Sequence, residues 1–275
     1  MKIPIDLVNM LPRLDKLLLD LLHSLSPADW NKQTVARQWK VKDVVAHLLD
    51  GNVRILSMLR DNYYGEKADA QSNEELIGYL NRLNADWVQA MKRVSPSMLI
   101  SLHEFTGPLY CNYYQSLDPF GISPFAVNWA GESKSRNWMH IAREYTEKWL
   151  HQQQIRDATG QNGLMTREYF YPFINVFMLA LPYTFRSREA AEGTIVKVTV
   201  ASDMGGSWYL YRAKGNWKLD SPPGDSIAAA VTLDADTAWK LFSKSLRPAD
   251  VKDKVQIAGD RALGETVLTM VSVMA

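Results

Sequence analysis

Four side chains that commonly bind metal ions lie close together in one segment of the sequence, from about residue 134 to 158. They are His140, Glu144, Glu147 and His151. On an α-helix, where each residue advances about 100°, these four residues fall within roughly 60° of one another. A histidine and a glutamate four residues apart can bind one ion, and there are two such pairs, His140/Glu144 and Glu147/His151. The spacing does not choose between the pairs, and a solvent-exposed helix face would show the same pattern.

A further candidate, His47, lies in an apolar run of a helix expected from about residue 41 to 63. A single histidine on an apolar helix face is often a hydrogen-bonded core residue. If a helical bundle instead buries His47 opposite the segment 134–158, it joins a Glu/His pair in a three-ligand site. Two histidines and one glutamate leave positions open for water or substrate, which is typical of catalytic metal sites. Because Cys111 is the single cysteine, imidazole and carboxylate groups must hold any metal.

The remaining histidines and the cysteine show no comparable pattern. His23 and His103 have no partner at ligand spacing, so we interpret both as structural or exposed residues. No base is linked to Cys111 by a recognisable motif, and we expect a packed free thiol rather than a nucleophile. These three residues are therefore left outside the candidate site.

The candidate ligands need helices to position them, and the first part of the sequence has helical periodicity. Leucines three and four residues apart predict the first helix, and Ser72 with Glu75 forms a capping box that starts another. The segment 117–133 is rich in turn formers and aromatic residues and predicts a loop. The expected helices cover residues 5–25, 41–63, 73–94, 95–105, 134–158 and 167–183.

After about residue 188 the periodicity changes from helical to alternating, which predicts a sheet. The expected strands cover residues 194–200, 207–212, 217–219, 228–233 and 255–260, with one helix over 236–244 and a last one running to the C-terminus. The fold class is therefore α+β. We expect a helical domain over residues 1–187 and a small α+β domain over 188–275, and two domains also fit a length of 275 residues.

Composition and charge restrict the class of protein further. The 31 lysines and arginines against 30 aspartates and glutamates give a net charge of +1, which removes the electrostatic argument for a nucleic-acid partner. No apolar run approaches the roughly 18 residues of a membrane span, and residues 1–16 lack the features of a signal peptide. A single cysteine fits a reducing compartment. We expect a cytoplasmic protein without nucleic-acid or membrane partners.

The segment 39–49 resembles a known family. It matches W-x-V-x-D-x-x-A-H-L, a motif of the DinB-like helical-bundle superfamily, and more narrowly it resembles the mycothiol-dependent maleylpyruvate isomerase family. In that family a second motif, E-x-x-x-H, lies on a later helix and supplies the remaining metal ligands. Glu147 to His151 matches this motif, so the resemblance selects this pair over the other. The chain has Gln154 where the family usually has an acidic residue, three positions after the second histidine.

The C-terminal part is similar to the sterol-carrier-like domain of the same family. The resemblance is carried by the segments 206–210, 215–217, 229–234 and 257–260, together with Trp239. It thus extends over nearly the whole chain. It implies a DinB-like four-helix bundle followed by a small sterol-carrier-like α+β domain.

The resemblance implies an enzyme that uses a low-molecular-weight thiol. A divalent metal held by His47, Glu147 and His151, zinc or else nickel, iron or manganese, would keep the thiol as its thiolate. The thiolate adds to a small electrophilic substrate, after which an isomerase returns the thiol and an S-transferase releases the adduct. Arg143 and Arg156 are candidate anion binders for a carboxylate of substrate or thiol, although each also suits a salt bridge.

Several alternatives stay open at this point. The thiol is of the mycothiol, bacillithiol or glutathione type, and the sequence does not choose among them or indicate the oligomeric state. The aromatic-rich loop and the sterol-carrier-like tail also suit a non-catalytic protein that binds a small molecule or a lipid. The expected partners are therefore a small-molecule substrate and a thiol, or one apolar ligand.

Overall fold

The structure, a computed structural model, describes residues 2–66, 68–69, 71–220, 224 and 226–273. Contacts between Cα atoms divide the chain into two compact units. The first comprises the chain up to Gly121 together with Arg136–Gly163, and the second comprises Ile122–Ser135 with the chain from Leu164 onward.

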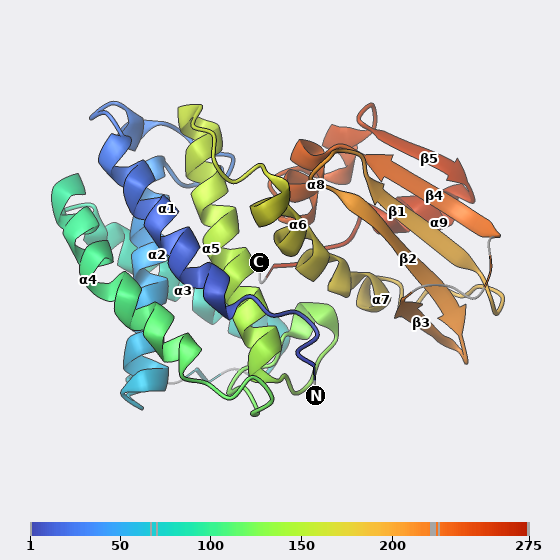
Figure 1. The fold of residues 1–275 in the computed structure, drawn as a ribbon, viewed down its shortest axis with the longest axis horizontal. Helices are drawn as coiled ribbons and strands as arrows, with labels where there is room; N and C mark the ends of the chain where they lie inside the picture. The colour runs from blue at the N-terminus through green and yellow to red at the C-terminus, as the bar shows by residue number, and fades with distance from the viewer. Residues whose placement is uncertain (1, 67, 70, 221–223, 225, 274–275) are drawn as a thin grey trace. The chain divides into compact units, whose positions relative to one another are not determined.

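The first unit is helical and has a four-helix bundle at its centre. Its helices are α1 (Leu11–Ser24), α2 (Val41–Ile55), α3 (Asn73–Met91), α4 (Pro96–Gln115) and α5 (Asn137–Thr159). Helices α1 and α2 each pack against α4 and α5, while α3 packs against α2 (Figure 1). A π-helical turn over Leu56–Arg60 extends α2. The bundle confirms that the N-terminal part of the chain is helical, as the fold class predicts.

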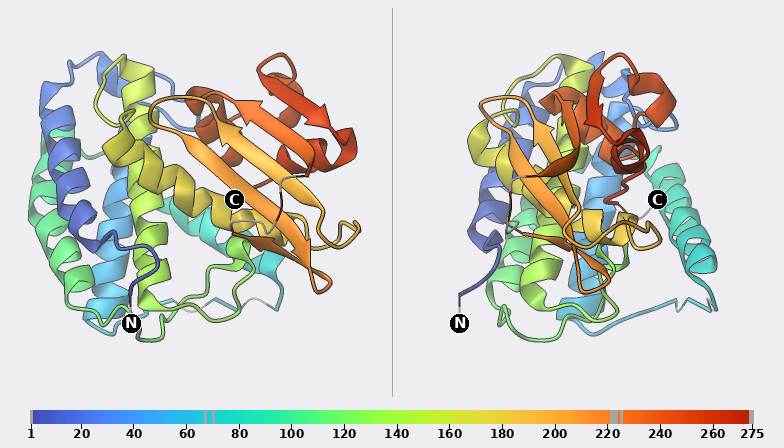
Figure 2. Two further views of the ribbon diagram at one scale, coloured as in Figure 1. Left: turned by 45° about the vertical axis from the view of Figure 1, so that its right-hand side comes forward. Right: turned by 90° about the vertical axis from the view of Figure 1, so that its right-hand side faces the viewer.

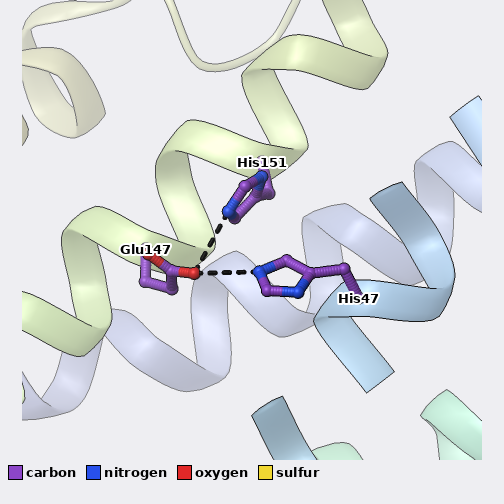
Figure 3. A group of neighbouring side chains, drawn as sticks. All are labelled: His47, Glu147 and His151. Carbon is purple, nitrogen blue, oxygen red and sulfur yellow. Dashed lines mark hydrogen bonds and ion pairs between the residues drawn. The ribbon is translucent and has the colours of Figure 1, made fainter. Parts of the chain in front are cut away.

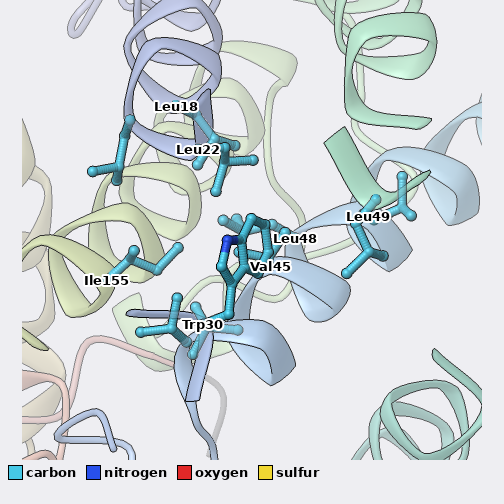
Figure 4. Close-up of a cluster of buried hydrophobic side chains, with 11 residues drawn as sticks. Leu18, Leu22, Trp30, Val45, Leu48, Leu49 and Ile155 are labelled. Atoms are coloured by element: carbon cyan, nitrogen blue, oxygen red, sulfur yellow. The ribbon is translucent and has the colours of Figure 1, made fainter. Parts of the chain in front are cut away.

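Apolar side chains from several helices meet in the core of the bundle. The leucines that share one face of α1 are buried there, as their spacing predicts. The cluster drawn in Figure 4 includes Leu18, Leu22, Trp30, Val45, Leu48, Leu49 and Ile155. Burying one leucine side chain contributes roughly 1.5–3 kcal/mol. The cluster therefore fixes α2 and α5, the two helices that carry the predicted ligands, with respect to each other.

Capping residues determine where two of the helices begin. The hydroxyl of Ser72 accepts a hydrogen bond from the backbone N–H of Glu75 at 3.1 Å, which confirms the predicted helix start. At the start of α2, the carboxylate of Asp43 accepts the backbone N–H of Lys40 at 3.0 Å. This bond satisfies a donor that the helix itself leaves free, and it sets the start of α2 shortly before His47.

Helix α4 is longer than the sequence predicts, because it continues beyond residue 105 and through Pro108. A proline inside a helix removes one hydrogen bond and crowds the preceding turn, which favours an earlier end. Here the residues after the proline are buried in the bundle, and Tyr110 and Tyr114 are 2% and 0% exposed. Packing of this second half outweighs the lost hydrogen bond, and the predicted end is wrong.

The second unit contains a five-stranded sheet in the order β3-β2-β1-β4-β5 (Figure 2). The strands are β1 (Ile195–Val200), β2 (Gly206–Ala213), β3 (Asn216–Leu219), β4 (Ile227–Leu233) and β5 (Val255–Gly259). Strands β1 and β4 pair in parallel, and the other neighbours are antiparallel. The helices of this unit are α6 (Arg167–Phe177), α7 (Leu181–Thr184), α8 (Ala235–Phe242) and α9 (Arg261–Val267).

The sheet follows the predicted alternation. In β1, Val196 and Val198 are buried, whereas Lys197 and Thr199 on the other face are half-buried. Helix α9 packs on β4 and β5 and ends at Val267 rather than at the C-terminus, so the predicted length of the last helix is wrong. The α+β class with an N-terminal helical part and a C-terminal sheet is confirmed.

The two compact units and the proposed domains are defined differently. The predicted division into residues 1–187 and 188–275 marks the point where helical periodicity gives way to strand alternation. The compact units are grouped by contact, and α6 and α7 belong to the unit of the sheet. Within the described part of the chain, no helix is long and apolar enough to cross a membrane.

Candidate metal centre

Three of the predicted ligands come together inside the helical unit. His47 lies on α2, and Glu147 and His151 lie one turn apart on α5. The Nε2 atoms of the two imidazoles each lie 3.1 Å from the same atom, Oε1 of Glu147 (Figure 3). One donor atom of each residue lies within 4.8 Å of the others. The structure therefore brings His47 to the pair that the resemblance selects.

Burial differs between the two sides of this group. His47 is 7% exposed and follows the buried residue Ala46 on the face of α2 that packs into the bundle. The side chain of Glu147 is 43% exposed, and that of His151 is 12% exposed. The group is thus enclosed on the side of His47 and accessible beside the carboxylate.

The second ring nitrogen of each histidine has a different environment. Nδ1 of His151 lies 2.9 Å from the amide oxygen Oε1 of Gln154, which can accept a hydrogen bond from the Nδ1–H group. Gln154 therefore orients the ring of His151, leaving Nε2 to face Glu147. Among the residues that the structure describes, Nδ1 of His47 has no hydrogen-bond partner.

The electrostatics of the group favour a bound cation. Burial lowers the pKa of His47, although its hydrogen bond with Glu147 acts in the opposite direction. Burial also opposes ionisation of Glu147, but the charge of His151 and the hydrogen bonds of both imidazoles hold its pKa well below the usual value. For His151 burial is outweighed by the Glu147 carboxylate, so its pKa is raised. A metal ion would displace that proton and keep the carboxylate paired.

The donor set fits a divalent metal ion. Bonds of about 2.0–2.2 Å at tetrahedral angles place neighbouring donor atoms roughly 3.3–3.6 Å apart. The two Nε2–Oε1 distances of 3.1 Å are slightly shorter than this spacing, so small shifts of the side chains would admit an ion. Imidazole and carboxylate donors suit zinc, and also nickel, iron and manganese. Three protein ligands leave a coordination position for a molecule from solution.

The alternative pair, His140 and Glu144, lies in a separate buried network. Nε2 of His140 is 3.5 Å from Oε1 of Glu144, and the hydroxyl of Tyr110 donates to Oε2 at 2.6 Å. The guanidinium of Arg143 pairs with Oε1. Burial would raise the pKa of Glu144, but the charge of Arg143 and the bond with His140 lower it to about 2. This carboxylate is already paired by protein groups.

The two predicted anion binders contact other parts of the helical unit. Besides its carboxylate partner, Arg143 contacts Nε2 of His140 at 2.8 Å. Arg156 is 6% exposed and donates to the backbone carbonyl of Leu17 at 3.0 Å and to that of Asn162. These bonds connect Arg156, a residue of α5, to α1 and to the segment that follows α5. The anion-binding role of both arginines stays a prediction.

Lys148, which follows Glu147 directly, is a half-buried charged residue whose environment the sequence patterns do not reveal. Its ammonium group donates to the side-chain oxygen of Asn52 and lies 4.4 Å from the centre of the Tyr110 ring. Burial lowers the pKa of Lys148. A lysine on a polar helix gives no sign of such burial in the sequence. The one available signal is Asn52, a polar residue on the apolar side of α2 that needs a partner.

The residues left outside the site behave as expected. Cys111 is 4% exposed, and burial raises its pKa to about 12, so its thiol is not a nucleophile at neutral pH. His103 is fully buried, and its Nε2 lies 3.0 Å from the carbonyl oxygen of Val45. His23 is exposed and lies 3.0 Å from Glu104.

Comparison with solved structures shows the fold. The chain is similar to a crystal structure of the mycothiol-dependent maleylpyruvate isomerase, with a TM-score of 0.54 and 11% identity over 91% of this chain and 92% of that chain. A histidine-to-alanine mutant of that isomerase gives a TM-score of 0.53 and 12% identity at the same coverage. A match to a ubiquinone synthesis protein covers 38% of this chain and 92% of that chain at 16% identity. Its TM-score of 0.26 is too low to show a shared fold.

Comparison of sequences shows the family. No curated protein matches the chain. The family model described as mycothiol maleylpyruvate isomerase N-terminal domain matches residues 11–156, which is more than half of the chain. The match includes His47, Glu147 and His151, and it confirms the resemblance drawn from the two motifs. The chain belongs to the mycothiol maleylpyruvate isomerase N-terminal domain family.

Proposed function

We propose that this chain is a metal-dependent enzyme that uses a low-molecular-weight thiol to isomerise a small electrophilic substrate or to conjugate the thiol to it. One observation carries the proposal: two imidazole Nε2 atoms converge at 3.1 Å on one carboxylate oxygen in a chain of this family. We assign His47, Glu147 and His151 as ligands of one divalent ion. Zinc is the expected metal, with nickel, iron and manganese as alternatives.

The chemistry requires a thiol from outside the chain. When bound, the ion supplies positive charge that lowers the pKa of a coordinated thiol, so that the thiolate forms at neutral pH. The single cysteine, Cys111, cannot serve, because it is buried and its pKa is raised to about 12. The external thiolate adds to a double bond conjugated to a carbonyl group. Rotation about the carbon–carbon bond that has become single, followed by loss of the thiolate, restores the double bond and returns the thiol, whereas protonation and release of the adduct give S-transfer.

The side chains of the protein orient the metal ligands and bind the substrate. Glu147 stays ionised and is partly exposed, so the group is accessible from solution. Gln154 fixes the ring of His151. Arg143 and Arg156 are the proposed anion binders, and Arg143 is the better placed, because it lies one turn before Glu147 and its side chain is 24% exposed. A carboxylate of the substrate would then lie beside the centre.

Mycothiol is the first thiol to test, because the family description names it, and bacillithiol and glutathione are the alternatives. The experiment is a thermal-shift panel in which metal-free protein receives zinc, each thiol, or both. We expect one thiol to raise the melting temperature only when zinc is present, and the His47→Ala variant to show no such effect.

The same panel separates the enzyme from a binding protein. If zinc binds but no thiol changes the melting temperature, the enzyme proposal fails. Native mass spectrometry of the protein purified from its producing cell then tests for a retained small molecule or lipid. A retained apolar ligand without metal would favour the non-catalytic alternative.

A further inference from the structure

An aromatic residue outside the ligand set packs against both ligand imidazoles. The ring centroid of Trp39 lies 4.7 Å from that of His47, with the planes inclined by 40°. It lies 6.0 Å from the ring of His151, at 43°. The two imidazoles meet edge to face, with centroids 4.6 Å apart. The indole and both imidazoles thus form one packed group of rings.

The two imidazoles differ in what holds their planes. A ligating histidine usually donates its second N–H to a neighbouring acceptor, which fixes the ring and its tautomer. His151 has such an acceptor in Gln154 at 2.9 Å. Within the described residues, the buried Nδ1 of His47 has none. Apart from the contact of its Nε2 with Glu147, the His47 ring is therefore held by packing, and the indole of Trp39 lies against it.

The backbone of Trp39 is itself held firmly. Its carbonyl oxygen accepts hydrogen bonds from the hydroxyl of Thr34 at 2.7 Å and from the side-chain amide Nε2 of Gln33 at 2.9 Å. Its N–H donates to the carbonyl of Ala36 at 2.7 Å. A bridge between Gln33 and Lys40 closes the loop immediately before α2 begins. A loop with this many internal bonds presents the indole in one place.

We propose that Trp39 is a positioning residue of the metal centre. Its ring orients the imidazole of His47 by packing, as the Gln154 amide orients that of His151 by a hydrogen bond. Both Nε2 atoms then point at Glu147. The proposal rests on the proposed function, because it assigns a role toward the ion that these ligands would hold. An aromatic face is what this role requires, since the contact is between ring surfaces rather than through a hydrogen bond.

The proposal predicts a ranking of variants by metal affinity. We expect Trp39→Leu to weaken zinc binding by about tenfold or more, the range found when groups that orient ligands are removed. Trp39→Phe keeps an aromatic face and should restore most of the affinity. The matched control is Trp138→Leu, because Trp138 also belongs to the helical unit but lies near the start of α5.

The experiment is a competition titration of zinc between each variant and a chromophoric chelator, combined with the visible absorption of the cobalt-loaded proteins. Loss of affinity and a changed cobalt spectrum in Trp39→Leu, with rescue in Trp39→Phe and no change in Trp138→Leu, supports the proposal. If Trp39→Leu does not fold, Gln33→Ala takes its place. That variant keeps the indole but removes the amide that holds its backbone, and we expect a smaller loss in the same direction.

The outcomes separate this inference from the function on which it rests. If wild-type protein binds neither zinc nor cobalt, the proposed function itself fails. If wild type binds and Trp39→Leu has the same affinity and spectrum, Trp39 does not position the ligands. Equal losses in Trp39→Leu and Trp138→Leu would also overturn the inference, because they would indicate general weakening of the bundle.

Discussion

The two histidines of the centre are oriented by groups of different chemistry. His151 is held by the neutral amide of Gln154, and His47 is packed against an indole. A carboxylate in place of the amide would add negative charge and make the imidazole a more basic ligand. Gln154 orients the ring without that charge, so His151 is a less basic ligand than it would be beside a carboxylate.

Changing Gln154 tests this role directly. We expect Gln154→Leu to lower zinc affinity by about tenfold, because the proton on Nδ1 of His151 loses its acceptor. Gln154→Glu keeps an acceptor and should bind zinc at least as tightly as wild type. Chelator competition measures both, with Gln153→Leu as a control at the adjacent buried position. Unchanged affinity in Gln154→Leu would contradict the role assigned to this amide.

A second residue-scale prediction concerns pH and His103. Burial, with a contribution from the charge of Lys148, lowers the pKa of His103 from 6.5 to about 4. Between these values the unfolded chain binds a proton that the folded protein excludes, so stability is full above pH 6.5 and falls as the pH drops toward 4. Because a difference of one pKa unit corresponds to about 1.4 kcal/mol, His103 should lower the free energy of unfolding by roughly 2–3 kcal/mol at pH 4.5.

Urea unfolding at pH 7 and pH 4.5, in the presence of EDTA, measures this effect. His103→Gln keeps a donor for the carbonyl of Val45 but does not titrate. Its loss of stability between the two pH values should therefore be smaller than that of wild type by about 2 kcal/mol. His23→Gln is the control, since His23 is exposed. The same pH dependence in His103→Gln and wild type would refute the prediction.

At the scale of elements, the close approach of α1 and α4 depends on a glycine. A Cβ atom at Gly107 would lie 2.4 Å from both carboxylate oxygens of Asp15. The sequence alone does not show this contact, because it joins two helices far apart in the chain. It also does not show that α4 continues beyond Pro108, since local propensity favours an end and only the packing of the bundle outweighs it.

Two glycine-to-alanine variants test the contact. In an open helical position, alanine stabilises by about 1 kcal/mol relative to glycine. A Cβ atom added at Gly51 in α2 would meet no neighbour within 4 Å, so Gly51→Ala should stabilise by that amount. Gly107→Ala should instead destabilise by about 1–3 kcal/mol, because the half-buried carboxylate of Asp15 must move. Urea denaturation at pH 7 compares the stabilities of the two variants. Stabilisation by Gly107→Ala would show that the contact between α1 and α4 adjusts to a Cβ atom at little cost.

At the scale of the whole molecule, periodicity and spacing account for what could be predicted. Helical and alternating patterns predict the α+β class. Spacing predicts two possible Glu/His pairs on one helix face, and the family resemblance selects Glu147 and His151 as the partners of His47. The contacts of Lys148 and Trp39 were beyond prediction, because they depend on how α2, α5 and the loop before α2 meet after packing.

Metal binding should stabilise the folded chain. The ligands come from two helices distant in sequence, so the unfolded chain lacks the group, and zinc favours the folded state. At free zinc a hundredfold above its dissociation constant, the gain is about 2.7 kcal/mol. Urea midpoints with zinc and with EDTA should differ accordingly in wild type and coincide in His47→Ala. A zinc-dependent shift of equal size in His47→Ala would place the bound ion elsewhere.

The number of metal ions bound per chain tests the assignment of His47, Glu147 and His151 as ligands. Protein purified without a His-tag, loaded with zinc and freed of excess, is analysed for wild type, His47→Ala and His140→Ala. We expect one ion in wild type and in His140→Ala, and none in His47→Ala. Absence of stoichiometric metal in wild type, or a full complement in His47→Ala, would contradict the assignment.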